Sequence, residues 1–487
     1  MAFRPPPPPA TVNSGSAQGP AGQPRWREIL APGLAARVGL IILGVWLNAA
    51  DALVTATVMP SVARDLGGWA WFGWAVAGYL LGSILAGASA GRLADRLGLT
   101  SALVLAAVTY AAGCAFSAAS PGMALFLVGR LAQGVGGGWI VGLCYVAIGA
   151  VVPERLWARM FAATAGVWGV ATLLGPLVGG LAAAAGHWRW AFWAFAAQGL
   201  AFAAAAVVLL AGARPAPGGN PRRGAPWRTL VALAAAVGAV GAADIAPGLL
   251  WPPALVATGL VLLALAGWVN GRPGERLLPR DAARPATTAG AGYAMIVTME
   301  ASTMAYGVYG AAILQVVYGL SPLAAGYAIC SLAAGWTVMA FVVADQPERR
   351  HAGLIRAGAG LNAVGIALLA LVIGLGHLWL VVGAGAVTGA GFGLCWSLAT
   401  RRILIAVPPE DQAAGSSAVP TCQLIGGAVG AAAAGAMANL VGLAHGFGAD
   451  RAVAAAPWLF AAFIPLAALG WLAALRLTRP LPAGTKA

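Results

Sequence analysis

Residues 38–60 read VGLIILGVWLNAADALVTATVMP, an apolar run that is long enough to cross a lipid bilayer as a helix. One acid, Asp51, interrupts this run near its middle. A carboxylate at the centre of a membrane span costs about 2.5–3.5 kcal/mol on insertion scales, so such acids are rare and usually functional. The stretch therefore predicts a membrane-spanning helix with a functional acid inside it.

The whole chain has the composition of a membrane protein. Of its 487 residues, 60% are hydrophobic and 9% are charged, against roughly 25% charged residues in ordinary soluble domains. Apolar segments of about 20 residues recur along nearly the whole length, which is typical of a polytopic helical membrane protein. Residues 1–33 are polar and proline-rich, so we expect a disordered tail there, with a proline-recognition ligand as the alternative.

The apolar segments predict an all-α polytopic membrane protein with fourteen transmembrane helices. The expected spans fall near residues 36–60, 68–90, 99–119, 122–151, 157–185, 190–212, 228–246, 249–270, 287–318, 322–344, 353–375, 378–406, 411–441 and 456–476.

The basic residues follow the loops between these spans. The formal net charge is +14, but nearly all of the 28 Lys and Arg residues fall in the tails and in loops on one side of the spans. Only Arg64, Arg189 and Arg451 fall on the other side, and Arg130 lies within a span. By the positive-inside rule, this bias places both termini in the cytoplasm. We therefore assign the basic residues to topology and to contacts with membrane phospholipid, and expect no nucleic acid as a partner.

Two loops rich in proline, glycine and arginine bracket a pair of short spans, with six spans before the pair and six after it. This pattern indicates a duplicated six-helix bundle with two inserted helices. The expected parts are a cytoplasmic tail at 1–33, an N-terminal six-helix bundle at 34–212, a linker at 213–227, the inserted helices at 228–270, a linker at 271–286, a C-terminal six-helix bundle at 287–477 and a cytoplasmic tail at 478–487.

A first motif, GRLADRLG, begins at Gly91 and ends at Gly98, directly after the second expected span. Asp95 is placed where it can cap a following helix. Arg96 is placed where it can pair across the helix junction. We expect this loop to take part in gating.

Two further motifs lie inside expected spans. GRLAQGVGGGWIVG, residues 129–142, places Arg130 within the membrane among glycines that permit close helix packing. GPLVGG, residues 175–180, contains Pro176, which removes a backbone hydrogen bond and kinks a helix. Its three glycines let another helix approach; they are Gly175, Gly179 and Gly180.

These motifs together resemble the major facilitator superfamily, and within it the fourteen-span branch of drug:proton antiporters. Three further stretches also match that branch, and they occur in the same order along the chain: DALVTATVMPSVARDLGG (51–68), AGYLL (77–81) and HWRWAFW (187–193). The resemblance implies a major facilitator fold of two six-helix bundles plus two inserted helices. It also implies that the protein works by alternating access, with proton-coupled export.

The sequence departs from that branch at three places. Leu99 and Thr100 stand where the loop motif usually ends in a basic pair. The copy of this motif in the second half is reduced to ADQPERRH at 344–351. Leu53 and Ala56 replace polar residues that usually follow the acid of the first span, which predicts a shifted substrate preference.

Helix rise predicts that Asp51 and Arg130 lie at the same depth. Asp51 is about 20 Å into a span that enters from the cytoplasm, and Arg130 is about 18 Å from the same face. We expect the two side chains to pair directly or through water, because a pair lowers the cost of burying both charges. Protonation of Asp51 would then release Arg130.

Glu300 occupies the corresponding position in the second half, again at a depth of about 18 Å. We expect no basic residue near it in the membrane, since Arg130 is the only one within a span. Burial without a charged partner favours the neutral form of a carboxyl group. Asp51, Glu300 and Arg130 are therefore the expected proton-coupling residues, and Glu300 also suits a cationic substrate.

The other polar groups predict no catalytic or metal site, no cofactor and no enzymatic activity. Asp244 lies toward the outer end of an inserted span, and Asp345, Glu410 and Asp411 are expected at helix ends. The four histidines fall in loops, and the five cysteines lie in apolar runs without metal-ligand spacing. No phosphate-binding GxxxxGK[ST] motif occurs, so the energy for transport must come from an ion gradient.

Aromatic and amide residues in the expected cavity helices predict a wide apolar–aromatic path. The same residue types also anchor helices at membrane interfaces or pack between them. The candidate substrate-binding residues are Trp46, Trp139, Tyr145, Trp168, Tyr293, Tyr306, Tyr309, Gln315, Trp396 and Gln423.

The sequence thus predicts a monomeric multi-pass protein of the bacterial cytoplasmic membrane that exports hydrophobic, amphipathic or cationic compounds in exchange for protons. The alternatives are export of one endogenous metabolite, lipid or siderophore on the same fold, since fold does not dictate substrate, uptake by symport, and a membrane-embedded enzyme. The last would need reactive groups clustered at one membrane face, which the sequence lacks.

Overall fold

The computed structural model describes residues 26–210, 226–243, 251–272, 277–344, 346–407, 412–443 and 447–479. Within these ranges the regular elements are helices, so the all-α prediction is confirmed. Eleven helical segments are long and apolar enough to cross a membrane. The shorter apolar helices α9 and α10 and the 30-residue helix α11 occupy the other three predicted spans. The full count of fourteen spans stays a prediction.

The first half of the chain contains long helices with short helical elements between them. Gly67 ends α2 in the left-handed conformation (φ 65°), and Gly98 (φ 78°) lies between α4 and α5; both positions favour glycine. The elements are α1 (Trp26–Ile29), α2 (Ala35–Leu66), η1 (Trp69–Trp71), α3 (Trp74–Gly87), α4 (Ala90–Leu97), α5 (Leu99–Ala119), α6 (Met123–Val151), η2 (Glu154–Leu156), α7 (Trp157–Ala184) and α8 (Trp188–Leu209).

The rest of the chain also combines long and shorter helices. They are α9 (Trp227–Ala242), α10 (Trp251–Asn270), α11 (Thr288–Val317), α12 (Pro322–Ile329), α13 (Ser331–Val343), α14 (Glu348–Val372), α15 (Leu378–Ala406), α16 (Gln412–Leu440), α17 (Ala449–Ala461) and α18 (Ile464–Leu477).

Several predicted boundaries differ from the structure. The spans expected at 322–344 and 456–476 are each divided into two helices, and the second begins earlier, at Ala449. Pro465 explains the second division, because proline has no N–H to donate and is favoured in the first turn of a new helix. The tail predicted to reach residue 33 carries the helix α1, and its residues 1–25 lie outside the described ranges.

The two halves pack their helices in the same way. In the first half α2 packs on α7 and α8, α5 packs on α6 and α8, and α3 packs on α6. In the second half α11 packs on α16 and α18, α14 packs on α15 and α18, and α13 packs on α15. Each pair in the first list has its counterpart in the second, so the packing of one six-helix set is repeated.

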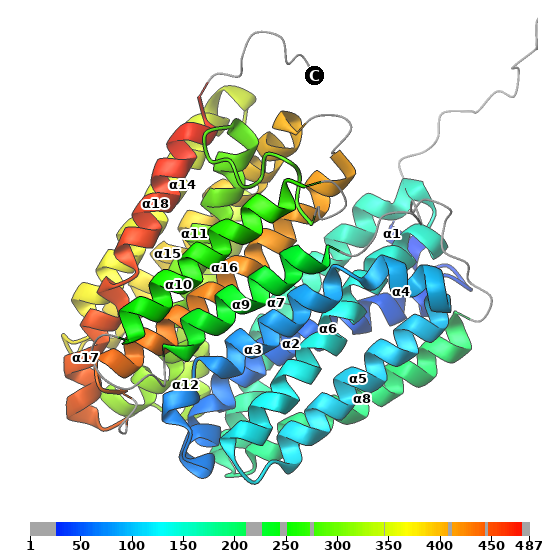
Figure 1. Cartoon of the computed structure of the whole chain (residues 1–487). Coiled ribbons are helices and arrows are strands. Elements are labelled where there is room, and N and C mark those ends of the chain that lie inside the picture. Colours follow the sequence, from blue (N-terminus) through cyan, green and yellow to red (C-terminus); the bar gives the residue numbers. More distant parts are fainter. Residues whose placement is uncertain are drawn as a thin grey trace, which may run out of the picture.

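The halves meet along a seam in which α3 contacts α16, α7 contacts α12, and α2 contacts α11 and α12. Figure 1 shows that the two halves diverge toward the end of the molecule that carries α1 and α4. The inserted helix α9 lies against both α3 and α16, with α10 beside it. Trp74 of α3 donates its indole N–H to the Gly241 carbonyl of α9 at 3.1 Å.

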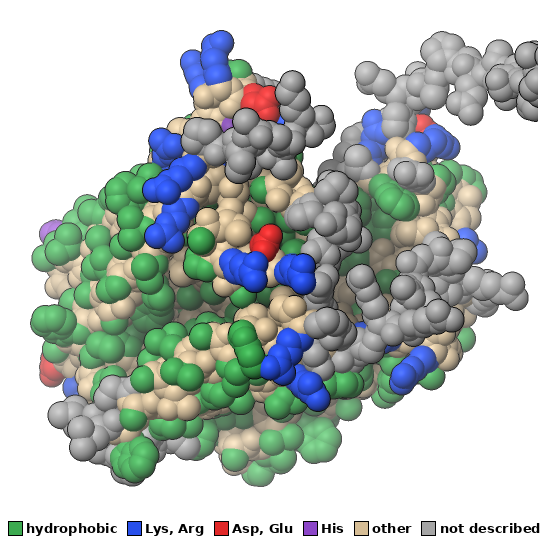
Figure 2. Space-filling view, turned by 45° about the horizontal axis from the view of Figure 1, so that its top comes forward, with side chains coloured by type: hydrophobic (Ala, Val, Ile, Leu, Met, Phe, Trp, Pro, Cys, Tyr) green, Lys and Arg blue, Asp and Glu red, His purple; other side chains and the backbone are tan. Residues whose placement is uncertain are grey.

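Basic side chains gather at one end of the molecule. Figure 2, in which the end with α1 and α4 is turned forward, shows Lys and Arg side chains spread over both halves. This distribution agrees with the charge bias of the predicted loops.

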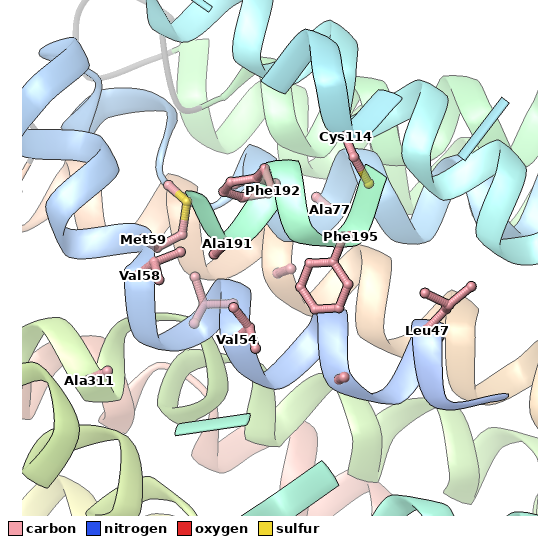
Figure 3. Packing of buried hydrophobic residues seen from close by; sticks show 14 of the residues in the cluster. Leu47, Val54, Val58, Met59, Ala77, Cys114, Ala191, Phe192, Phe195 and Ala311 are labelled. Carbon is pink, nitrogen blue, oxygen red and sulfur yellow. The ribbon is translucent and has the colours of Figure 1, made fainter. Parts of the chain in front are cut away.

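In the interior of the first half, α2 packs against α8. Leu47, Val54 and Val58 of α2 lie opposite Phe192 and Phe195 of α8 in Figure 3, and all five are buried. In a bilayer, lipid tails are as apolar as these side chains, so packing contacts rather than exclusion from water hold the helices together. This packing fixes α2 and thereby the position of Asp51 on another face of it.

Candidate functional site

Asp51 of α2 and Arg130 of α6 form a direct ion pair inside the first half. Arg130 Nη1 donates to Asp51 Oδ1 at 3.2 Å and to Oδ2 at 3.1 Å. The relative exposure is 0% for Asp51 and 1% for Arg130, so the pair is sealed from solvent in this conformation. The predicted contact between the two residues is confirmed.

Further side chains complete the hydrogen bonding of the pair. The Gln133 amide donates to Asp51 Oδ1 at 2.8 Å, and its oxygen accepts from Arg130 Nη1 at 2.8 Å. Thr55 Oγ1 donates to Asp51 Oδ1 at 3.2 Å. Arg130 Nε donates to the Ala75 carbonyl of α3 at 3.0 Å. The buried charges are therefore surrounded by matched partners, as burial of charge requires.

Tyr79 of α3 covers the remaining face of Arg130. The guanidinium carbon lies 4.5 Å from the centre of the Tyr79 ring, a distance suited to a cation–π contact. The Tyr79 hydroxyl donates to Asn48 Oδ1 of α2 at 2.7 Å. Asn48 and Asp51, three residues apart, thus connect α2 to α3 and α6 through adjacent polar contacts.

Our sequence reasoning did not identify four members of this site: Asn48, Thr55, Tyr79 and Gln133. A spacing signal was present for three of them. Residues three or four apart lie on one helix face, which places Asn48 and Thr55 beside Asp51. The same rule places Gln133 beside Arg130. Tyr79 comes from a third helix, so only the packing of α3 on α6 reveals it.

Glycines allow α3 and α5 to approach α6 closely around the pair. A Cβ at Gly134 would lie 2.1 Å from the Tyr79 carbonyl oxygen, and one at Gly136 would lie 2.3 Å from the Tyr110 nitrogen. Both distances are impossible for a larger residue, so the predicted close packing around the arginine motif is confirmed. The contact brings the Ala75 carbonyl and the Tyr79 ring within reach of Arg130.

The arrangement has two charge states with different bonding. With Asp51 ionised, the charge of Arg130 is neutralised, and both Asp51 oxygens as well as Nε and Nη1 of Arg130 have hydrogen-bond partners. With Asp51 protonated, Arg130 keeps Gln133, the Ala75 carbonyl and the Tyr79 ring, but loses its counter-ion. Gain or loss of one proton therefore changes how strongly α2 is held to α6.

Glu300 of α11 lies next to Gln423 of α16, whose amide donates to Glu300 Oε2 at 3.3 Å. Gly426 lets the two helices approach, because a Cβ there would lie 2.4 Å from the Val297 carbonyl oxygen and 3.0 Å from Glu300 Cβ. Glu300 is half-buried. Among the described residues it makes no ion pair.

The GPLVGG glycines of α7 contact two neighbouring helices. A Cβ would lie 2.6 Å from Leu53 Cβ at Gly175, 3.0 Å from the Val54 carbonyl oxygen at Gly179, and 2.6 Å from Leu323 Cα at Gly180. The first two contacts are to α2, and the third is to α12 of the other half. The prediction that these glycines permit close helix approach is confirmed.

Pro176 also lies at the contact between the halves. A Cβ at Gly326 of α12 would be 2.9 Å from Pro176 Cβ. Nearby, the Tyr327 hydroxyl of α12 donates to the Leu173 carbonyl at 3.0 Å. Cys330 Sγ lies 3.4 Å from the Thr172 carbonyl oxygen. The motif thus forms part of the seam.

The first motif lies in and after α4. Asp95 and Arg96 are exposed near the end of α4, with no hydrogen bond or ion pair between their side chains and other described residues. The residue that caps α5 is Gly98, without a side-chain bond. The expected capping role of Asp95 is therefore wrong, because Asp95 lies within α4 and Gly98 makes the turn. Gly91 has open space around its Cα.

The ten candidate substrate-binding residues do not form one group. Gln423 adjoins Glu300, while Trp46 donates to Gln198 Oε1 at 3.1 Å and Trp139 donates to Ser89 Oγ at 2.9 Å. Trp396 lies 5.4 Å from Trp336, centre to centre.

Three of the candidates are tyrosines of α11, and all three are buried between helices: Tyr293, Tyr306 and Tyr309. Gln315 is half-buried near the end of the same helix. Tyr145 stacks on Phe161, and Trp168 is 45% exposed. A substrate contact for any of the ten candidates stays a prediction.

The sequence analysis placed four further acids outside the predicted site. Asp244, Asp345, Glu410 and Asp411 lie outside the described residues. Across the described part of the chain, no three His, Cys, Asp or Glu side chains come together as a metal site. The five cysteines are unpaired thiols.

Two repeated helical sets that meet along a seam, with a charge pair sealed among membrane helices, define a membrane transporter. The sequence pattern of the Major Facilitator Superfamily matches residues 41–361. The chain belongs to that superfamily, and it is a transporter rather than an enzyme.

A curated relative supports the same assignment over nearly the full length. A probable multidrug-efflux transporter of Mycobacterium tuberculosis is 32% identical over 465 residues, which cover 93% of this chain and 96% of the relative.

Solved transporter structures share the fold. A D-xylose–proton symporter matches with a TM-score of 0.64 at 17% identity, covering 93% of this chain and 99% of that one. A POT family transporter matches with a TM-score of 0.67 at 13% identity, covering 93% and 97%. At these identities the likeness concerns the fold alone.

Proposed function

We propose that this transporter exports hydrophobic, amphipathic or cationic compounds across the bacterial cytoplasmic membrane in exchange for protons. The observation that carries the proposal is the sealed Asp51–Arg130 pair with Gln133, because a buried carboxylate with a matched cation is the group whose protonation changes helix contacts. The relative named as a probable multidrug-efflux transporter supports the direction and the breadth of substrates.

The exporter works by alternating access, with the two halves closing one end of the path at a time. Both termini lie in the cytoplasm, so the end with α1 and α4 faces inward. The seam at GPLVGG and α12 then closes the outer end, which makes the present conformation inward-facing. Protonation of Asp51 loosens α2 from α6, and its release of the proton restores the pair.

The other sequence predictions complete this proposal. The protein is a monomer of the fourteen-span antiporter branch, with two six-helix bundles and α9 and α10 as inserted helices. Glu300 is the second titrating group or the site that senses a cationic substrate. Gly91, Asp95, Arg96 and Gly98 take part in gating at the cytoplasmic end.

The test is proton movement in proteoliposomes that contain a pH-sensitive dye. Adding a lipophilic cation such as ethidium should move protons through the wild-type protein but not through Asp51→Asn, because an amide does not titrate. Asp450→Asn, which changes an exposed acid in the first turn of α17, should leave the signal unchanged. Full proton coupling in Asp51→Asn would remove Asp51 from the mechanism.

A further inference from the structure

Arg130 has three contacts that do not depend on the charge of Asp51. Its Nε donates to the Ala75 carbonyl at 3.0 Å, its Nη1 donates to Gln133 Oε1 at 2.8 Å, and its guanidinium carbon lies 4.5 Å from the centre of the Tyr79 ring. Gln133 lies on α6 itself, whereas Ala75 and Tyr79 both lie on α3. When Asp51 is neutral, Arg130 is therefore held to α3 rather than to α2.

Tyr79 is fixed in the position where its ring meets the cation. It is 4% exposed, and its hydroxyl donates to Asn48 Oδ1 at 2.7 Å. Two glycines of α6 make room for it. A Cβ at Gly134 would lie 2.1 Å from the Tyr79 carbonyl oxygen, and one at Gly137 would lie 2.7 Å from the Tyr79 hydroxyl oxygen. A larger residue at either position would displace the tyrosine from Arg130.

The attraction between the ring and the guanidinium depends on the charge of Asp51. The face of an aromatic ring carries partial negative charge, so it attracts a cation and repels an anion. While Asp51 is ionised, it lies 3.1 Å from Arg130 Nη1, and the ring faces an ion pair without net charge. Once Asp51 is neutral, the ring faces a cation alone, in a buried site where electrostatic interactions are strong. Tyr79 therefore contributes most in the protonated state.

We propose that Tyr79 is a positioning residue of proton exchange. Its ring keeps Arg130 on α3 while Asp51 is protonated, so that the guanidinium is in place to receive the carboxylate when the proton leaves. Tyr79 itself takes up no proton. This role rests on the proposed function, and it supplies the group that stands in for the counter-ion during one part of the cycle.

Thermal unfolding of the full-length protein in detergent measures the charge dependence without substrate or gradient. Position 79 carries either phenylalanine or a trifluorinated phenylalanine. The two rings are nearly equal in size and both lack the bond to Asn48, but the fluorinated face attracts a cation much less. Fluorination should lower the unfolding midpoint by about 1–2 °C in the Asp51→Asn background. With Asp51 present and ionised, the midpoint should move by less than half as much.

Two controls separate the charge of Arg130 from the size of the ring. In Asp51→Asn/Arg130→Met no cation remains, so the two rings at position 79 should give the same midpoint. Phe202 is a buried ring of α8 that faces no cation among the described residues. Its fluorinated form should shift the midpoint equally with and without Asp51. An effect at position 79 that is the same in every background would make Tyr79 a packing residue and overturn the proposal.

Proton movement in proteoliposomes then tests the role of Tyr79 in exchange. At saturating ethidium, the fluorinated ring should slow proton movement about fivefold relative to phenylalanine at the same position. The half-saturating ethidium concentration should not change, because the ring is buried against Arg130. Equal rates with the two rings would overturn the positioning role, whatever the unfolding shows. No proton movement in the wild-type protein would instead refute the proposed function, and the positioning role would fall with it.

Discussion

Arg130 makes use of the geometry that distinguishes arginine from lysine. Its planar guanidinium reaches both Asp51 oxygens, the Gln133 amide and the Ala75 carbonyl while its face lies over Tyr79. A lysine ammonium has three donors but no plane to stack on a ring. The site therefore requires arginine for its shape as well as for its charge.

Removing Arg130 should cost more stability than removing both charges. Arg130→Met leaves Asp51 buried without a cation, which should lower the free energy of unfolding by about 3–5 kcal/mol. The double variant Asp51→Asn/Arg130→Met carries neither charge and should be less destabilised. Thermal unfolding in detergent measures both, with Asp450→Asn as the control.

The pH dependence of the single variant follows from the same charge. Protonated Asp51 is neutral, so the instability of Arg130→Met should shrink as the pH falls and should grow as the pH rises. The double variant should show no such trend, because it has nothing to titrate at this site. Equal destabilisation of the two variants at every pH would mean that the unpaired carboxylate is not the cause.

Glu300 is expected to distinguish cationic from neutral substrates. Its neighbour Gln423 donates a hydrogen bond but supplies no charge, so an arriving cation would favour ionisation of Glu300 and release of its proton. Glu300→Gln should reduce export of a cationic dye more than export of a neutral dye, whereas Asp51→Asn should reduce both. Equal residual activity for the two dyes in Glu300→Gln would leave Glu300 as a proton site at most.

The sequence was sufficient to predict the Asp51–Arg130 contact because both charges lie in apolar spans and helix rise gives their depth. Gln133 and Thr55 were not predicted, because burying a neutral polar side chain in a span costs less than burying a charge. Such a residue therefore points less clearly to a functional site. The sequence also did not predict which aromatic side chains are exposed and which are buried. From the sequence, Tyr306 and Tyr309 were candidate residues of a substrate cavity, but tertiary packing buries them between helices.

At the scale of helices, α7 connects the acid-bearing helix with the other half. Gly175 and Gly179 adjoin Leu53 and Val54 of α2, only two and three residues beyond Asp51. Gly180 adjoins α12 across the seam. A change in how α2 packs on α6 can therefore reach the seam through one helix.

Gly179→Leu is expected to cripple transport, because its side chain would displace Val54 and Thr57 of α2, which lie about 3 Å from a Cβ at this position. The matched control is Gly166→Leu on the same helix, where a Cβ meets nothing within 4 Å. Both variants should insert normally, and dye efflux from cells compares them. Wild-type efflux with leucine at 179 would show that this close contact is not needed in the transport cycle.

Long apolar runs predicted the helices well, because a backbone in lipid must satisfy its hydrogen bonds within the segment. Their interruptions were less predictable. The division at Cys330 has no proline or glycine to signal it, and α2 continues through Pro60 to Leu66. Membrane helices tolerate such prolines where neighbouring groups compensate for the lost bond.

At the scale of the whole molecule, the seam is the surface where the two repeated sets of helices meet. Contacts across it include Asn439, which donates to the Ala70 carbonyl at 2.8 Å, and the stacked rings of Trp69 and Phe447, 4.7 Å apart. The alternating access that we propose requires these contacts to break when the other end closes.

A covalent link across the seam should therefore stop transport. A Cβ at Gly180 lies 2.9 Å from Leu323 Cβ, somewhat shorter than the 3.5–4.5 Å usual in disulfides, so a small helix shift lets cysteines at both positions bond. The variant Gly180→Cys/Leu323→Cys should lose dye efflux on oxidation and regain it on reduction. Each single cysteine variant serves as the control for the native thiols and for the loss of Gly180. Undiminished efflux in the fully cross-linked protein would mean that α7 and α12 stay together throughout the cycle, and the moving surface would then have to lie elsewhere, at the contact of α3 with α16.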